Sequence, residues 1–284
     1  MAFERNILYV TDLDGTLLGE TPEVPEKAAE MLNKMLAQGL RFSVATARAW
    51  ASAKPILEKL NLNLPVVLYN GAQLLDPRTG KVLVQCAMSA PQLHGIHEAM
   101  AQNGVCGRFE GEIEGKVRSS WMKEEENEGL YAYTDARKGD KRFRPVEDIE
   151  RLCDGEIITV NAFDRKEKLE KAAETIRNID GLAYTLISSN YVEGWYWLSV
   201  MRQDATKAQG VLRLKERVGA EKLVCFGDNL NDLSMFSVAD EAFAVGNAHE
   251  MLKKAASRVI LPNTQTGVPK FIAENEDFLD LVSP

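Results

Sequence analysis

The chain has 284 residues, 45% hydrophobic and 27% charged, which is typical of a globular protein with one large domain or two of ordinary size. Its formal net charge of −8 argues against nucleic acid as the main partner, because binding to a phosphate backbone needs a basic surface. A phosphorylated small molecule is not excluded, since it needs only a few local cations or a metal ion.

Targeting signals and cysteine chemistry point to the cell interior. No run of about 18 apolar residues occurs, so we expect no membrane span, and the residues before Asp12 lack the apolar region of a secretory signal. No two of the four cysteines form a C-x-x-C pair, which favours reduced thiols over zinc or disulfides. We expect a cytoplasmic protein that binds no membrane and is a monomer or a weak homo-oligomer.

The first part of the chain alternates apolar runs with amphipathic stretches. Near-continuous apolar runs of four to six residues are typical of strands buried on both faces, as in a parallel sheet. Apolar residues at helical spacing indicate helices between them. The predicted elements are a strand at 7–10, a helix at 26–38, a strand at 40–45, a helix at 50–60 and a strand at 66–69.

The middle of the chain interrupts this alternation. Between about residues 84 and 202 the pattern predicts helices and strands without the regular β-α order, and blocks of like charge suggest solvated faces. The predicted elements are helices at 90–103 and 164–180 and strands at 157–163, 184–188 and 195–201. We interpret this segment as an inserted α+β domain.

The last part returns to the alternation. The predicted elements are a helix at 206–218, a strand at 223–226, a helix at 230–238, a strand at 242–245 and a helix at 250–256. Strands alternating with helices predict a Rossmann-like, doubly wound α/β core, built from residues 1–83 and 203–284. Ligands of such sheets bind at the carboxyl ends of the strands, where five polar residues would gather: Asp12, Thr46, Asn70, Asp228 and Asn247.

The hexapeptide DLDGTL at residues 12–17 delivers two carboxylates from the end of a predicted strand into a glycine turn. Two nearby carboxylates resist ionising together unless a cation or a shared proton compensates them. Asp12 and Asp14 could hold Mg²⁺, or one could act as a nucleophile and the other as an acid and base. The structural alternative is a simple aspartate turn in which Gly15 takes an unusual backbone conformation.

A second acidic cluster, GDNLND at residues 227–232, also follows a predicted strand and opens a helix. Asp228 would face the same sheet edge as Asp12 and Asp14, and three converging carboxylates make Mg²⁺ the natural counterion. Capping of the helix by aspartate or asparagine is the alternative explanation.

Thr46 and Lys207 complete a phosphoryl site in principle. A hydroxyl at a strand end can donate to a phosphoryl oxygen, and an ammonium at a helix N-terminus can neutralise the developing charge. Alone, each residue is weak evidence, because such threonines are usually structural and lysines are usually solvated.

Taken together, these residues make the chain similar to the haloacid dehalogenase-like (HAD) superfamily, and most of all to its Cof-type phosphatases with a large cap of type IIB. DLDGTL resembles the first motif of that family, Thr46 the second, Lys207 the third and GDNLND the fourth, with the cap inserted between the second and the third. The string at residues 70–72 resembles a further feature of the subgroup.

The resemblance implies a Mg²⁺-dependent phosphatase acting on a small phosphorylated metabolite, with a sugar phosphate as the first expectation. Asp12 would be the nucleophile that forms an aspartyl-phosphate, and Asp14 would protonate the leaving alcohol and then activate water. Mg²⁺ would be held by the Asp12 carboxylate, the Asp14 backbone carbonyl and Asp228. The inserted domain would exclude water and select the leaving group.

The remaining site residues follow from the same resemblance. The transferring phosphoryl group would contact Thr46 and Lys207, while Asn231 and Asp232 would support the metal or Lys207. The other expected substrate contacts are Arg48, Asn70 and Gly71.

Two positions depart from the pattern of the subgroup. Ala47 stands where a glycine is usual, so its backbone must suit a residue with a Cβ. Residues 202–206 lack the usual proline and glycine before Lys207, which affects the path of the linker rather than the lysine itself.

Some alternatives and residues stay open. A phosphomutase would use the same aspartyl-phosphate. A non-catalytic phosphometabolite-binding protein is disfavoured, because it would have little need for four converging charges: Asp12, Asp14, Lys207 and Asp228. For His94 and His97, which lie three apart without a carboxylate at a telling spacing, we expect a structural role rather than metal binding. For the aromatic run at 195–197 we expect cross-strand packing. A second anionic group of a substrate could meet any of four cations, among which the sequence does not choose: Arg48, Arg108, Lys116 and Arg118.

Overall fold

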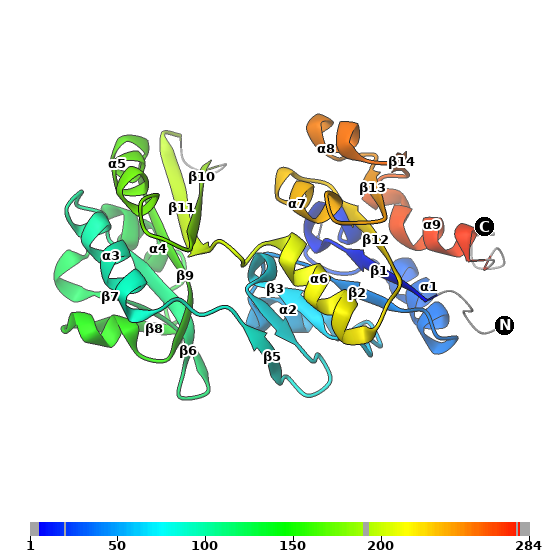
Figure 1. Cartoon of the computed structure of the whole chain (residues 1–284), viewed down its shortest axis with the longest axis horizontal. Helices are drawn as coiled ribbons and strands as arrows, with labels where there is room; N and C mark the ends of the chain where they lie inside the picture. Colours follow the sequence, from blue (N-terminus) through cyan, green and yellow to red (C-terminus); the bar gives the residue numbers. More distant parts are fainter. Residues whose placement is uncertain (1–5, 20, 190–192, 277, 279–284) are drawn as a thin grey trace. The chain divides into compact units, whose positions relative to one another are not determined.

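The computed structural model describes residues 6–19, 21–189, 193–276 and 278. The chain divides into two compact units, one formed by Met1–Val84 with Ala205–Pro284 and the other by Gln85–Asp204 (Figure 1). We call them the core unit and the inserted unit and describe each by itself.

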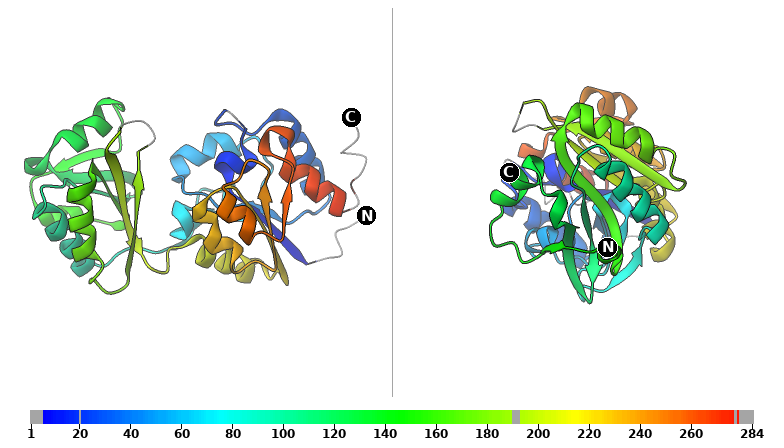
Figure 2. Two further views of the ribbon diagram at one scale, coloured as in Figure 1. Left: turned by 90° about the horizontal axis from the view of Figure 1, so that it is seen from above. Right: turned by 90° about the vertical axis from the view of Figure 1, so that its left-hand side faces the viewer.

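A parallel sheet forms the centre of the core unit, in the order β14-β13-β12-β1-β2. Helices lie on both of its sides, with α1 and α6 opposite each other (Figure 2). This arrangement confirms the predicted doubly wound α/β core. Its strands are β1 (Ile7–Thr11), β2 (Phe42–Val44), β12 (Lys222–Gly227), β13 (Glu241–Val245) and β14 (Arg258–Ile260). Its helices are α1 (Glu26–Ala37), α2 (Trp50–Leu57), α6 (Lys207–Val218), α7 (Leu233–Phe236), α8 (Glu250–Ala255) and α9 (Gly267–Asn275).

The apolar run at 66–69 differs from its expected place in the main sheet. It forms β3 (Val66–Leu68), which pairs antiparallel with β4 (Gln73–Leu75) in a small sheet completed by β5 (Val82–Gln85). A single parallel bridge between Ala45 and Val67 joins β3 to the end of β2. The chain turns back at residues 69–71, so antiparallel pairing with β4 replaces a longer parallel ladder.

Helix α1 shows how the sequence pattern becomes packing. The periodicity predicts one apolar stripe on this helix, and its residues are buried: Ala29, Leu32, Met35 and Leu36. The helix ends where Gly39 takes a left-handed φ of +101°, a conformation that glycine adopts without steric cost.

The inserted unit is a six-stranded sheet in the order β10-β11-β9-β6-β7-β8, antiparallel except between β7 and β8. Helices α3 and α5 pack on the face that carries Phe109 and Val160, and α4 lies against β9. Its strands are β6 (Arg108–Ile113), β7 (Lys116–Met122), β8 (Phe143–Val146), β9 (Glu156–Arg165), β10 (Leu182–Ser188) and β11 (Trp195–Arg202). Its helices are α3 (Ala90–Ala101), α4 (Glu128–Asp135) and α5 (Lys166–Ile176), with short turns η3 (Lys123–Glu125) and η4 (Ile149–Cys153).

All four cysteines are free; Cys86, Cys106 and Cys225 are buried and Cys153 is half-buried. None of the helices in the described ranges is long and apolar enough to cross a membrane.

Candidate active site

The carboxyl end of β1 carries the first catalytic candidate. Asp12 follows this strand directly, is 6% exposed, and donates its backbone N–H to the carbonyl of Phe226 on the neighbouring strand β12 at 2.9 Å. The chain then makes a tight turn over Leu13–Leu17, which is closed by a hydrogen bond from the amide of Leu18 to the carbonyl of Leu13 at 2.9 Å. The strand pairing therefore fixes the backbone on both sides of the Asp12 carboxylate.

Gly15 lets this turn pass directly beside Asp228. Its φ is +83°, a conformation that strains other residues, and a Cβ there would lie 2.4 Å from Asp228 Oδ2, so a side chain at this position would displace the Asp228 carboxylate. The next residue, Thr16, donates its hydroxyl to Asp228 Oδ1 at 2.8 Å. The glycine turn thus joins the two acidic motifs that the sequence predicts to share one edge.

Lys207 is the first residue of α6, and its side chain is only 1% exposed. Its Nζ lies 2.5 Å from Asp12 Oδ1 and 2.6 Å from Asp232 Oδ1. The other oxygen of Asp232 accepts the backbone amides of Asp228 and Asn229, both at 3.0 Å. Asp232 is therefore held at both oxygens, and it orients Lys207 toward Asp12.

These groups perturb one another strongly. Burial raises the pKa of Asp12 from 3.8 to about 7; Lys207 opposes this rise, and the charges of Asp232 and Asp228 add to it. Burial also raises the pKa of Asp228. Burial alone would lower the pKa of Lys207, but the carboxylates of Asp12 and Asp232 raise it above its ordinary value, so the ammonium stays charged. One ammonium thus forms ion pairs with two carboxylates while the carboxylate of Asp228 lies close to both.

The donor set fits a hard divalent cation. Among the described residues, Asp12, Asp228 and Asp232 have carboxylate oxygens that all lie within 4.8 Å of one another. Because both oxygens of Asp232 already accept hydrogen bonds, Asp12 and Asp228 are the carboxylates with capacity left for a metal. Oxygen donors with excess negative charge are what Mg²⁺ prefers.

Asp14 has a different environment from Asp12. Its side chain is 55% exposed, and both of its oxygens accept from Arg48, at 2.7 Å from Nε and 2.5 Å from Nη2. Such a two-point contact fixes the plane of a carboxylate as well as its position. The structure thus places Arg48 beside the expected acid and base.

Thr46 is buried two residues after the end of β2, and its hydroxyl accepts the backbone amide of Arg48 at 3.2 Å. Ala47 between them is not among the described non-glycine residues with positive φ. Its Cβ therefore causes no backbone strain, which explains how this chain dispenses with the usual glycine.

The loop after β3 is strained in a way the sequence does not reveal. Tyr69, Asn70 and Gly71 have φ values of +49°, +53° and +104° in succession. A Cβ at Gly71 would lie 1.9 Å from the carbonyl oxygen of Thr206, so the loop packs directly against the start of α6. Left-handed conformations in non-glycine residues cost free energy and cluster at functional sites.

Asn70 is linked to the same sheet edge. It donates its backbone N–H to the carbonyl of Thr46 at 2.9 Å, and its Oδ1 lies 3.5 Å from Nδ2 of Asn231. Asn231 thus contacts Asn70, whereas it is Asp232 that contacts Lys207.

Two asparagines from the last part of the chain hold the turn after Asp12. Asn247 donates its Nδ2 to the carbonyl of Gly15 at 2.8 Å and accepts the amide of Asn263 at 3.0 Å. Asn263 in turn donates to the carbonyl of Leu18 at 2.7 Å. The sequence places Asn247 at this edge and Thr16 inside the first acidic motif. It does not indicate the contact of Thr16 with Asp228, nor any role of Asn263, which lies outside both acidic motifs.

In the inserted unit, most of the residues that the sequence analysis considered for binding are held by ion pairs or ring packing. Arg108 is 3% exposed, pairs with Glu110 and stacks 3.5 Å from the centre of the Tyr133 ring. His97 and His94 lie 2.7 and 3.4 Å from Glu125 and Glu150. Trp195 and Trp197 pack against the ring of Phe163, as cross-strand packing predicts. Lys116 is exposed at the start of β7.

Comparison with known proteins adds the family context. A family model described as haloacid dehalogenase-like hydrolase matches residues 9–272. The chain is 25% identical to the 5-amino-6-(5-phospho-D-ribitylamino)uracil phosphatase YwtE of Bacillus subtilis, covering 92% of this chain and 95% of the relative. It is 24% identical to the pyridoxal phosphate phosphatase YbhA of Escherichia coli, over 92% and 95%. Its fold matches that of BT4131, a sugar phosphatase of HAD subclass IIB, with a TM-score of 0.69, 21% identity and coverage of 94% and 98%.

The first prediction concerns the pH dependence of stability without metal. The pKa of Asp12 is about 7 in the folded protein, and its ordinary value of 3.8 applies to the unfolded chain. Protonation of Asp12 therefore adds to the free energy of unfolding: the addition is largest below pH 3.8, decreases as the pH rises, and is gone above about pH 7. In EDTA, the native protein should therefore lose stability relative to Asp12→Asn between pH 5 and 8, measured by urea unfolding.

The matched control is Asp240→Asn. The pKa of Asp240 is lowered by the backbone amide of Leu223 and by Lys215, so this carboxyl stays ionised over the same range. Its variant should differ from the native protein by a constant amount. A constant difference for Asp12→Asn as well would contradict the raised pKa.

The second prediction concerns Asn247. Asn247→Ala removes the hydrogen bond that positions the turn after Asp12, and should lower kcat by about tenfold while lowering the free energy of unfolding by only about 1 kcal/mol. Asn33→Ala is the control, because Asn33 also donates to a carbonyl (Lys59) and accepts an amide (Asn61), but from helix α1 to the segment after α2 rather than at the turn after Asp12. Equal kcat values in the two variants would show that Asn247 has no positioning role.

Proposed function

This chain is a phosphatase of the haloacid dehalogenase-like hydrolase family, of the Cof type, and from that premise we propose that it hydrolyses a small phosphorylated metabolite through an aspartyl-phosphate at Asp12. The observation that carries the proposal is the buried Asp12–Lys207–Asp232 ion-pair cluster at the end of β1. It presents one carboxylate oxygen beside an ammonium, the arrangement that an attack on a phosphate dianion needs.

These contacts support the following two-step chemistry in our proposal. Asp12 attacks phosphorus in line while Lys207 neutralises charge on the phosphoryl oxygens, and the Thr46 hydroxyl donates to the same group. The leaving alcohol takes a proton from Asp14, which then removes a proton from the water that hydrolyses the aspartyl-phosphate. Asp232 does not react; it holds the ammonium in place.

A divalent cation completes this site in our proposal. Asp12, Asp228 and the Asp14 backbone carbonyl would hold Mg²⁺, which supplies charge neutralisation that lets the phosphate dianion approach the Asp12 carboxylate. Burial raises the pKa values of Asp12 and Asp228, and a nearby cation would lower both, so that Asp12 is ionised at neutral pH.

Arg48 gives Asp14 its orientation. The two-point contact holds the plane of the Asp14 carboxylate, while the exposure of Asp14 leaves its side chain accessible to substrate and solvent. We assign Arg48 to positioning first and to contact with the substrate second.

The names of the related phosphatases support a proposal for the substrate class. Their names give two phosphate monoesters of unlike leaving groups, a ribitylaminouracil phosphate and pyridoxal phosphate, so the shared element is the phosphate ester. We propose that the substrate is a small phosphorylated metabolite, with a sugar phosphate as the first candidate. We further propose that the enzyme acts in the cytoplasm and does not bind nucleic acid. Residues 84–202 would select the leaving group as a cap.

The third prediction tests the nucleophile and the metal together. Asp12→Asn should lower phosphate release by about a thousandfold or more, because an amide cannot form the acyl phosphate. EDTA should abolish release by the native protein, and Mg²⁺ should restore it. The assay is inorganic phosphate release from a panel of sugar, nucleotide and glycolytic phosphates.

Asp240→Asn serves as the matched control, since it makes the same chemical change outside the site, and it should keep native activity. Full activity of Asp12→Asn would sink the mechanism, and activity in EDTA would exclude the metal. Conversion of a sugar phosphate to its isomer without phosphate release would identify a phosphomutase instead.

The fourth prediction concerns Arg48. Arg48→Lys keeps the charge but loses the two-point contact, and should lower kcat by about tenfold with little change in KM. Arg78→Lys is the control, because Arg78 contacts Asp76 with the same two groups on the surface. A rise in KM alone would show that Arg48 binds substrate, and unchanged kinetics would rule out both roles.

A further inference from the structure

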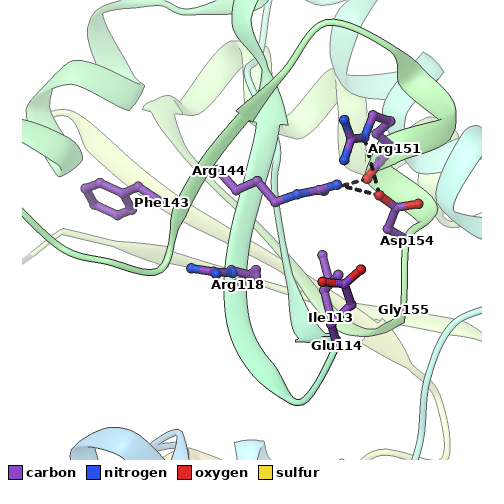
Figure 3. A pocket seen from close by; sticks show the side chains of 8 residues that line it. All are labelled: Ile113, Glu114, Arg118, Phe143, Arg144, Arg151, Asp154 and Gly155. Atoms are coloured by element: carbon purple, nitrogen blue, oxygen red, sulfur yellow. Dashed lines mark hydrogen bonds and ion pairs between the residues drawn. The ribbon is translucent and has the colours of Figure 1, made fainter.

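The inserted unit contains a cavity of about 770 Å³ that no step of the reaction uses. It lies among the β6–β7 hairpin, β8 and the segment after η4, as Figure 3 shows. Its volume is in the range of small-molecule sites. Its lining includes three arginines from three different elements: Arg118 of β7, Arg144 of β8 and Arg151 of η4.

Arg144 is held in place before any ligand arrives. Its side chain is 17% exposed, and its Nη1 donates to Ser120 Oγ at 3.2 Å and to the carbonyl of Arg151 at 2.8 Å, while Nη2 pairs with Asp154. A guanidinium fixed in this way has already lost most of its rotamer freedom, so it binds a planar or tetrahedral oxyanion at low entropic cost.

Arg118 provides the positive charge that no carboxylate compensates. Its Nη1 donates to the carbonyl of Lys141 at 2.5 Å, and within the described ranges no carboxylate lies at ion-pair distance from it. The half-buried guanidinium therefore has donors left and a counterion missing.

The two carboxylates of the lining do not cancel these charges. Asp154 is shared between Arg144 and Arg151, which leaves it no capacity to neutralise Arg118. Glu114 lies at the tip of the hairpin and is exposed. A ligand with an oxyanion for Arg118 and Arg144 and hydroxyl groups for Glu114 would satisfy both signs of charge.

The walls are rigid because backbone packs against backbone. A Cβ at Gly155, where φ is +73°, would lie 2.2 Å from the carbonyl oxygen of Glu112. A Cβ at Gly111 would lie 2.1 Å from the carbonyl oxygen of Glu156. The hairpin and the segment after η4 therefore touch without side chains between them, and the cavity is a built feature of the fold.

We propose that this cavity binds an oxyanion, phosphate or carboxylate, carried by a small hydroxylated metabolite, with Arg118 and Arg144 as its anchors. The inference does not depend on the proposed catalytic mechanism, since all of its residues belong to the inserted unit. The oxyanion belongs either to the substrate, as a second anionic group, or to a separate effector.

The test locates binding directly on the arginines. The full chain, labelled with ¹⁵N-arginine and kept in EDTA, is titrated with inorganic phosphate and with sodium chloride of equal ionic strength, and the Nε–Hε resonances are followed by NMR. Phosphate should shift the Arg118 and Arg144 resonances saturably, and chloride should not. The resonance of Arg48 reports binding at the catalytic site independently.

Arg118→Gln should weaken this binding by about tenfold, the loss expected for one charged hydrogen-bonding partner. Lys116→Gln removes the same charge from the same strand outside the lining and should leave the affinity unchanged. The proposal is overturned by an absence of saturable shifts at Arg118 and Arg144, by shifts confined to Arg48, or by equal losses in the two variants.

Kinetics then identify the source of the oxyanion. Glycerol 3-phosphate has a hydroxymethyl group where 3-phosphoglycerate has a carboxylate, and the two compounds are otherwise alike. If Arg118→Gln raises KM only for the carboxylate compound, the cavity binds part of the substrate. If both KM values are unchanged while phosphate binding falls, the cavity binds a separate effector. In either case the catalytic site is intact, so failure of the binding test and failure of the proposed mechanism are distinguishable.

Discussion

The ion pair between Lys207 and the carboxylates of Asp12 and Asp232 is the interaction on which the rest of the core unit depends. Burying three charges costs more than their attraction returns unless every remaining hydrogen-bonding position is filled. Here the backbone amides of Asp228 and Asn229 fill those of Asp232. The cost is thus met by strand and helix ends that converge at one place, which explains why a doubly wound sheet suits this site.

The same ion pair connects distant parts of the chain. Asp12 precedes the inserted unit and Lys207 follows it almost at once, so the chain that leaves the core unit for some 120 residues must return to within 2.5 Å of its first motif. Gly71, packed against the carbonyl of Thr206, guides this return from the other side. A side chain at residue 71 would displace α6 and with it the ammonium, which links a backbone detail to catalysis.

Much of the core unit could be predicted because its signals are local. Strand ends, helix periodicity and the two acidic motifs are written in consecutive residues, and they gave the fold class, the family and the convergence of Asp12 with Asp228. The sequence did not indicate that β3 leaves the main sheet, since a short apolar run looks the same whether its strand pairs in the main parallel sheet or in the small antiparallel sheet. Nor did it indicate that Arg48 faces Asp14 or that Asn263 holds the turn, because both contacts depend on loops brought together only by folding. In the inserted unit, β6, β7, β8 and α4 were missed since polar and charged residues such as Arg108 occupy buried positions through pairing and stacking.

The free cysteines have a consequence beyond the redox state that they indicate. Cys225 belongs to the hydrophobic cluster of the core unit and Cys106 to a separate cluster of the inserted unit, and burial raises the pKa of both thiols. A thiol in such surroundings reacts only when its own unit opens. Cys225 is the one cysteine of the core unit, whereas the inserted unit also contains Cys86 and the half-buried Cys153. The rates at which Cys225 and Cys106 become alkylated, resolved by peptide, therefore distinguish opening of one unit from unfolding of the whole molecule.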